Sequence, residues 1–238
     1  MNKLKKITTL FLLLFSVVAS AMDSSITDDI GDLVQKGDAA ALVKLKQGAD
    51  NGDVESEVLL GEYFLTQKDG KKQAVEWFKK TADQGNWRGQ LDLGYCYANG
   101  LGIEKDNNQA LIWYTKSALQ GNLDAQKALG TFYRYVLAND KQAIIWLTKA
   151  ADHGGSEHDD ESRILLGDYY YFGDGVGKNE VISYALYDLA DDHQDLLNTD
   201  WNLTKSQIKT AKVLKQRMFK IGVSSAIDEY LKSVHESK

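Results

Sequence analysis

Two apolar patterns alternate along the chain between residues 38 and 194. The first is a Leu-Gly pair with an aromatic residue three places after the glycine, and it occurs at Leu60, Leu93, Leu129 and Leu166. A small residue lies four places before each leucine, so the small residue, the leucine and the aromatic share one stripe of a helix. The leucines are 33, 36 and 37 residues apart. A period of this length predicts repeated helical units.

The second pattern predicts another helix after each of the first three Leu-Gly helices. It places a tryptophan three residues after an alanine, in "KQAVEWFKKTADQGN" (72–86), "NQALIWYTKSALQGN" (108–122) and "KQAIIWLTKAADHGG" (141–155). A degenerate copy lies at 182–194 and a half copy without tryptophan at 38–53. We name the first helix of each pair the A helix and the second the B helix. Glycines at the ends of the B helices are expected to act as C-terminal caps: Gly52, Gly85, Gly121 and Gly154.

The two patterns together resemble the Sel1-like repeat family, a relative of the tetratricopeptide solenoids. The resemblance covers residues 38–194 and is clearest in "ALGTFY", "LGYCYANGLGIEKDNNQALIWYTKSALQG" and "LGDYYYFGDGVGKNE". The chain departs from the family pattern where the loops at 66–71 and 136–140 lack the G-x-G, and it lacks the cysteines of the disulfide-rich members.

The resemblance implies an all-α fold, a right-handed α/α solenoid of helix pairs closed by a C-terminal helical cap. The segment "NLTKSQIKTAKVLKQRM" (202–218) resembles the helix that caps such arrays. A helix pair cannot bury its apolar face alone, so the units must stack. We expect a signal peptide at 1–21, an N-terminal half-repeat at 22–52, repeats at about 53–85, 86–121, 122–157 and 158–195, and capping helices at 196–238.

The N-terminus has the three parts of a secretory signal peptide. Lys3, Lys5 and Lys6 precede an apolar stretch from residue 7 to 18, which ends in the A-x-A motif at Ala19–Ala21. We expect cleavage after Ala21 and a periplasmic or secreted product; the alternative is an uncleaved anchor helix, for which the apolar run is short. No later segment is apolar enough to span a membrane.

Charge and cysteine content limit the partners. The formal charge of −6 becomes −9 once the three signal lysines are removed, which argues against nucleic acid and anionic membranes as partners. Cys96 is the only cysteine, so the fold must hold without an internal disulfide. We expect a monomer, although the sequence does not set the oligomeric state.

Several stretches could carry chemistry, and each has a structural alternative. The glycines and Lys178 of "GDGVGKNE" (173–180) have the composition of a phosphate-binding loop, but an amphipathic helix precedes them and Asn179 follows the lysine. The same repeat position holds "NGLGIEKD" (99–106), so we interpret both as turns.

The segment 152–162 could bind a metal through His153, His158, Asp159, Asp160 and Glu161, but no spacing is diagnostic and a solvated loop explains it as well. Cys96 occupies a helix position held by aromatic residues in the other repeats, which favours a packed thiol over a nucleophile. We expect no catalytic residues, no metal and no cofactor. A β-lactamase-like or peptidoglycan-active hydrolase is the enzymatic alternative, although the partner motifs of serine β-lactamases are missing.

The expected binding surface is the side of the A helices opposite the leucine stripe, which we call the A-helix face. Positions two and five residues from the leucine fall on that side at 100° per residue, and the resemblance implies that they line a concave groove. We expect a protein or an extended peptide to bind there, with the chain acting as an immunity-type inhibitor of a secreted effector or, alternatively, as a periplasmic regulator or adaptor. The partner-binding candidates are Val58, Glu62, Arg88, Leu91, Tyr95, Asp124, Lys127, Thr131, Arg134, Glu161, Ile164, Asp168 and Tyr171.

Overall fold

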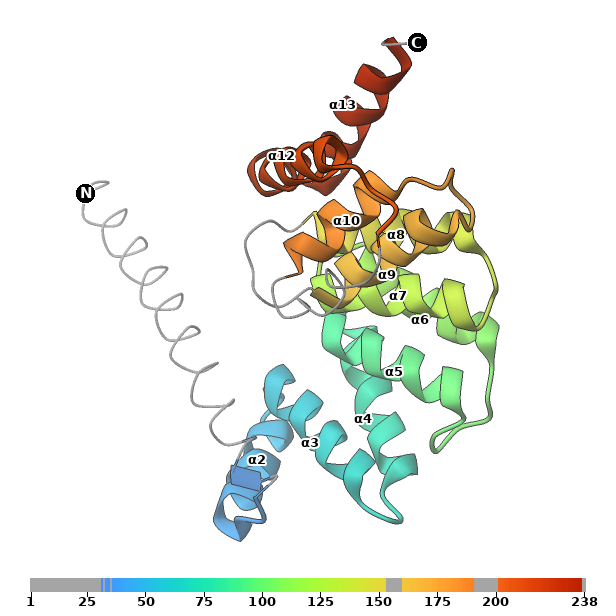
Figure 1. Ribbon diagram of the computed structural model, residues 1–238. Coiled ribbons are helices and arrows are strands. Elements are labelled where there is room, and N and C mark those ends of the chain that lie inside the picture. Colours follow the sequence, from blue (N-terminus) through green and yellow to red (C-terminus); the bar gives the residue numbers. More distant parts are fainter. Residues whose placement is uncertain (1–30, 32, 35, 153–159, 191–200, 237–238) are drawn as a thin grey trace, which may run out of the picture. The chain divides into compact units, whose positions relative to one another are not determined.

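The protein is helical throughout the part that the structure describes. The computed structural model describes residues 31, 33–34, 36–152, 160–190 and 201–236, and these ranges contain eleven α-helices and no strand. The predicted signal peptide and Gly154 lie outside them. The helices are α2 (Ala39–Asp50), α3 (Val54–Thr66), α4 (Lys71–Asp83), α5 (Trp87–Asn99), α6 (Asn107–Ala118), α7 (Leu123–Tyr135), α8 (Asp140–Ala151), α9 (Asp160–Phe172), α10 (Glu180–Leu189), α12 (Lys205–Ile221) and α13 (Val223–Glu236) (Figure 1).

The chain divides into two compact units, which we call unit 1 (up to Asp106) and unit 2 (from Asn107). In unit 1 the helices α2, α3, α4 and α5 each pack against the next one along the chain. In unit 2 the same holds from α6 to α10, after which α12 packs on α10 and α13 on α12. The A helices are α3, α5, α7 and α9, and the B helices are α4, α6, α8 and α10, preceded by α2, the B helix of the half copy. The expected all-α fold of stacked helix pairs with a helical cap is confirmed.

Each helix pair begins and ends through local chemistry that the sequence repeats. Asp53, Asn86 and Asn122 cap the first three A helices, and each side chain accepts a hydrogen bond from the backbone N–H three residues later. The B helices end at glycines in the left-handed region, with φ of +83° at Gly52, +85° at Gly85 and +84° at Gly121. The predicted glycine caps are confirmed at these three positions.

The buried stripe of the A helices contains the predicted leucines, but its next core residue lies one position earlier than the predicted aromatic residue. The leucines at 60, 93, 129 and 166 are at most 3% exposed. The next core position is three residues after the leucine, where Cys96, Phe132 and Tyr169 are buried, whereas the aromatics four residues after it are only half-buried. The expectation that the latter complete the core stripe is therefore wrong by one position.

A similar displacement occurs in the B helices. Trp77 and Trp113 are half-buried and only Trp146 is buried, while the residue after each tryptophan lies in the core: Phe78, Tyr114 and Leu147. The lysine three residues after each tryptophan lies over the indole ring, at 5.1, 3.9 and 4.0 Å from the ring centroid. The tryptophans therefore stand at the edge of the core, with a cation over one face of the ring.

The glycines of three Leu-Gly pairs, Gly61, Gly130 and Gly167, permit a close approach of the two helices in a repeat. A Cβ on Gly61 would lie 2.5 Å from the Phe78 ring, and one on Gly130 would lie 2.8 Å from Leu147. In both cases the neighbour is the residue that follows the tryptophan of the B helix. The side chain that follows the tryptophan of the B helix therefore packs against the A helix at the glycine, where the A helix has no side chain.

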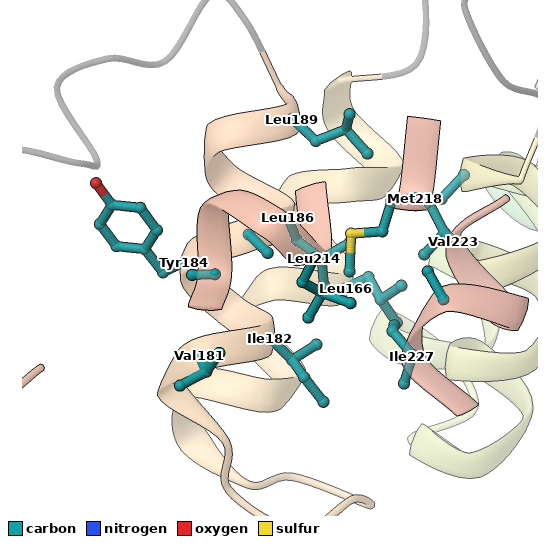
Figure 2. Packing of buried hydrophobic residues seen from close by; sticks show 14 residues of the cluster. Leu166, Val181, Ile182, Tyr184, Leu186, Leu189, Leu214, Met218, Val223 and Ile227 are labelled. Atoms are coloured by element: carbon teal, nitrogen blue, oxygen red, sulfur yellow. The ribbon is translucent and has the colours of Figure 1, made fainter. Parts of the chain in front are cut away.

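The C-terminal cap completes the core of unit 2. Leu214 and Met218 of α12 and Val223 and Ile227 of α13 are at most 4% exposed and belong to one cluster with residues of α10. Figure 2 shows Leu186 of α10, Leu214 and Met218 pointing toward one another. Asp152, just after α8, also accepts a hydrogen bond of 2.7 Å from the backbone N–H of Ser224, which fixes the start of α13. The apolar side of α10 is thus covered by the cap.

Candidate functional site

Arg88 links the two A helices of unit 1. Its Nη2 lies 2.8 Å from Oε1 of Glu62 on α3, and its Nη1 donates to Glu55 on the same helix. Burial lowers the pKa of Arg88, but the nearby Glu62 and Glu55 carboxylates outweigh burial and raise it above its ordinary value. Two predicted surface residues, Arg88 and Glu62, are thus paired with each other across consecutive A helices.

A third carboxyl group, that of Asp92, interacts with Arg88 and Glu62, and its buried Oδ2 has no hydrogen-bond partner among the described residues. Burial raises the pKa of Asp92 to about 7, with a further contribution from Glu62 that Arg88 opposes. We call Glu55, Glu62, Arg88 and Asp92 the acidic cluster, since three carboxyl groups share one guanidinium.

Asp92 is absent from the sequence-based candidates. Its position, one residue before the leucine, holds Leu59 and Leu165 in two other repeats, both buried. The sequence could have indicated Asp92, because an acidic residue stands there in place of the leucine of two other repeats.

Tyr95 lies beside the acidic cluster and is exposed. Arg88, Asp92 and Tyr95 follow each other at spacings of four and three residues, which places them on one side of α5. The tyrosine is 47% exposed, whereas Leu91 on the same helix is half-buried. The A-helix face of unit 1 therefore presents an aromatic ring next to an excess of carboxyl groups.

In unit 2, Arg134 and Asp168 pair across α7 and α9. Nη2 of Arg134 lies 3.4 Å from Oδ2 of Asp168, and its Nη1 donates to the Leu165 carbonyl oxygen at 3.3 Å. The other oxygen of Asp168 accepts a hydrogen bond of 2.7 Å from the Tyr187 hydroxyl of α10. Burial and this bond raise the pKa of Tyr187. Because Arg134 and Asp168 find their partners within unit 2, they stabilise the packing of its helices and are less suited to contact a binding partner.

The remaining polar candidates of unit 2 are more accessible. Lys127 lies 3.3 Å from Glu161, whose side chain is 65% exposed, and Asp124 is exposed at the first turn of α7. The Thr131 hydroxyl donates to the backbone oxygens of Lys127 and Ala128, and Ile164 is half-buried. Asp124 and Glu161 are therefore the residues of this group that a partner can reach.

Tyr171 belongs to an aromatic cluster at the junction with the cap. Its ring centroid lies 5.5 Å from that of Trp201, which also packs against Tyr184 and Tyr187 at 5.3 and 5.7 Å. The Lys178 ammonium lies 5.3 Å from the centroid of the Tyr171 ring. Tyr171 is half-buried by these contacts and contributes to packing.

Val58 is not a surface residue, and its prediction as one is corrected. Its side chain is fully buried, in a run from Ser56 to Gly61 that is buried without interruption. Helical periodicity alone assigns position 58 to the outer side, but the first turns of α3 are enclosed all round. No partner can reach Val58 while the helix is folded.

The residues proposed for other chemistry have structural roles where the structure describes them. Gly173 and Gly175 have φ of +84° and +69°, and the loop follows the helix α9, not a strand, as expected for a turn. Cys96 is fully buried, which confirms a packed thiol, and this burial raises the pKa of the thiol to about 12. His153, His158 and Asp159 lie outside the described residues, while Asp160 pairs with Arg163. Within the described ranges no group of three His, Cys, Asp or Glu side chains could hold a metal ion.

Comparison with protein families now identifies the repeat. The model of the Sel1 repeat matches residues 54–86, 87–122, 123–155 and 160–190, which together make up more than half of the chain. The chain belongs to the Sel1 repeat family. The four matched Sel1 repeats correspond to the pairs α3–α4, α5–α6, α7–α8 and α9–α10.

The chain is also similar to solved structures of Sel1 repeat proteins and to part of one curated protein. A Sel1 repeat protein from Oxalobacter formigenes has a TM-score of 0.53 and 27% identity, over 63% of this chain and 61% of that one. A protective antigen of uropathogenic Escherichia coli, c5321, has a TM-score of 0.43 and 27% identity, over 81% of this chain and 51% of that one. The rat DAP3-binding cell death enhancer 1 is 34% identical over 67 residues, which are 28% of this chain and 13% of that protein. The chain thus matches only a small part of that curated relative.

Sel1 repeats generally serve as protein-interaction scaffolds without catalytic activity, and the helix pairs described here fit that use. None of the described helices is both long and apolar enough to cross a membrane.

Proposed function

We propose that this Sel1 repeat protein is an exported, non-catalytic binding protein that holds a protein partner on its A-helix face. The observation that carries the proposal is the buried Oδ2 of Asp92, which has no hydrogen-bond partner and lies beside the exposed Tyr95. A buried carboxyl group without a partner lowers stability, and such groups are concentrated at functional sites. A partner's cation that packs beside the exposed Tyr95 would add an attraction to the carboxyl groups of the acidic cluster.

The charges of the A-helix face favour a basic partner. In unit 1 the carboxyl groups of Glu55, Glu62 and Asp92 lie around the Arg88 guanidinium. In unit 2 the acids Asp124, Glu161 and Asp168 are opposed by Lys127 and Arg134. Complementary charge steers association and selects partners. We therefore propose a protein or extended peptide that presents lysine or arginine next to an apolar side chain, the latter packing on Tyr95.

Site-specific photocrosslinking tests this proposal. A benzoyl-phenylalanine at position 95 should capture a partner in the native envelope, whereas the same residue at position 43 should not. Val43 is a suitable control because it is 54% exposed and lies on α2 of the same unit. Equal capture at both positions, or capture at position 43 alone, would contradict binding at the A-helix face.

The proposed location is the periplasm or the exterior, after cleavage behind Ala21. The residues 1–21 carry the lysines, the apolar stretch and the A-x-A motif that support it. Mass spectrometry of the protein isolated from its own cells should find an N-terminus at Met22. An N-terminus at Met1 in the cytoplasmic fraction would contradict export.

Among binding roles we propose neutralisation of a secreted effector, as an immunity-type inhibitor. The acidic charge of the chain and its signal-like N-terminus support this role. An effector-like reading frame next to the gene, whose basic product binds the protein, would support inhibition. A regulator or adaptor of an envelope complex is the alternative, supported if the captured partner is a resident envelope protein. Hydrolysis of nitrocefin by the pure protein would instead favour a hydrolase.

A further inference from the structure

The cap helix α12 carries a charge opposite to that of the whole chain. Its 17 residues include six cations and no acid, in a chain with a formal charge of −6. The cations are Lys205, Lys209, Lys212, Lys215, Arg217 and Lys220. The net charge of the whole chain does not reveal the positive charge of this helix. The expectation that anionic membranes are excluded as partners therefore does not apply to the surface of α12.

The fold turns most of these cations outward. Ala211, Leu214 and Met218 are buried against α10, and Figure 2 shows the last two pointing into that core. At 100° per residue the opposite side of the helix contains the exposed Lys205, Lys209, Lys212 and Lys220. We call these four residues the lysine face. Along a helix of 17 residues it extends over about 25 Å.

The lysine face has no counter-charge within the described part of the protein. Lys215 pairs with Asp188 at 3.4 Å, and Arg217 pairs with Glu229 of α13. The four lysines of the face form no ion pair in the described ranges. Four like charges on one helix side repel each other, so an anionic surface that approaches them gains attraction and relieves this repulsion.

Two apolar side chains border the lysine face. Phe219 is 67% exposed and Val213 is 53% exposed, each next to a lysine in the sequence. Exposed apolar residues among lysines suit a boundary that is charged outside and apolar beneath, such as the headgroup region of a bilayer.

We propose that the lysine face of α12, with Phe219 and Val213, docks the protein on an anionic phospholipid surface. Lysine is depleted in protein interfaces, where arginine is enriched, so a face made of lysine alone favours a diffuse charged surface over a protein. Lysines near such a surface contribute about 1 kcal/mol each, so four of them are enough for reversible binding. This binding does not depend on the A-helix face of unit 1, so either proposal can fail alone.

Vesicle flotation tests the inference on the chain from Met22, which retains every described residue. Vesicles of phosphatidylcholine with 30% phosphatidylglycerol should bind the protein, and pure phosphatidylcholine should bind it at least tenfold less. A triple variant, Lys209→Gln, Lys212→Gln and Lys220→Gln, should weaken binding about 100-fold, at about fivefold per lysine. Phe219→Ser should weaken it as well, at unchanged charge.

The matched control is Lys71→Gln, Lys72→Gln and Lys79→Gln on α4, which removes three exposed lysines from unit 1. It should bind the anionic vesicles within about twofold of the unmodified protein, because the lysine face is intact. Equal losses in the two triple variants, or equal binding to the two kinds of vesicle, would overturn the inference. Tighter binding to soluble poly-glutamate or to duplex DNA than to the vesicles would also overturn it, by assigning the face to an acidic protein or to nucleic acid.

Discussion

Nη2 of Arg88 on α5 lies 2.8 Å from Oε1 of Glu62 on α3, in a cluster that also contains the unsatisfied Asp92. The arginine connects two consecutive A helices and interacts with three carboxyl groups. The same residues therefore stabilise the stacking of repeats and leave an acidic excess for a partner. The predictions for unit 1 follow from these two roles.

Replacing Arg88 with methionine should lower the free energy of unfolding by roughly 1–3 kcal/mol, because half-buried carboxylates lose their charged partner. The loss should be larger at pH 8 than at pH 5, since Asp92, with a pKa raised to about 7 by burial, is protonated at the lower pH. Urea denaturation at both pH values measures this. Arg217→Met is the control, since its exposed pair with Glu229 should contribute at most about 1 kcal/mol.

Asp92→Leu should stabilise the protein above pH 7 and have a smaller effect at pH 5. The folded protein keeps the Asp92 proton up to about pH 7, whereas the unfolded chain loses it near pH 4, so this group makes stability fall as pH rises between those values. Leucine removes that dependence and matches the buried Leu59 and Leu165 at the same repeat position. Thermal melting between pH 4 and 8 measures it. A variant with the same pH dependence as the unmodified protein would contradict the assignment.

Gly175→Ala should lower the free energy of unfolding by about 1–3 kcal/mol. Gly177→Ala in the same loop should change it by at most about 0.5 kcal/mol. Gly175 has φ of +69°, and a Cβ there would lie 2.8 Å from the Cβ of Asp140 at the start of α8. A Cβ on Gly177 would meet nothing within 4 Å. Similar losses for the two substitutions in urea denaturation would show that the close approach to Asp140 does not matter.

The thiol of Cys96 should react with a thiol reagent only after unfolding. It is fully buried, and burial first, with Asp92 adding to it, raises its pKa to about 12, so almost no thiolate exists at pH 8. The labelling rate should therefore follow the population of unfolded protein as urea is increased. Rapid labelling of the native protein would indicate an accessible thiol and would reopen the question of a nucleophile.

The sequence predicted the repeated elements well because their signals are local. Glycines at helix ends act within a few residues of themselves, so Gly52, Gly85 and Gly121 could be interpreted as caps without knowledge of the stacking. The core stripes were less certain. Phe78 and Leu147, one place after the tryptophans, are fully buried because a glycine of the A helix presses against them, which periodicity alone does not show.

The binding candidates depended on contacts between repeats, and these could be predicted only in part. Periodicity placed Arg134 and Asp168 on the expected side of their helices, but not in a pair that satisfies both. It placed Val58 on the outside, although the enclosure of α3 buries it. Asp92 and the lysine face of α12 were missed because a comparison of equivalent repeat positions, and of charge helix by helix, was needed to find them.

The most direct test of binding at the A-helix face compares the affinity of the captured partner for two double variants of unit 1. Tyr95→Ala with Asp92→Asn removes the exposed ring and the unsatisfied carboxyl group while keeping the acidic side chain's shape. Val43→Ala with Asp83→Asn makes matched changes at exposed positions on α2 and α4. Calorimetry should show binding weakened at least about 30-fold by the first variant, as for a central interface residue, and within about twofold for the second. An unchanged affinity for the first variant, with its fold intact by circular dichroism, would contradict the account.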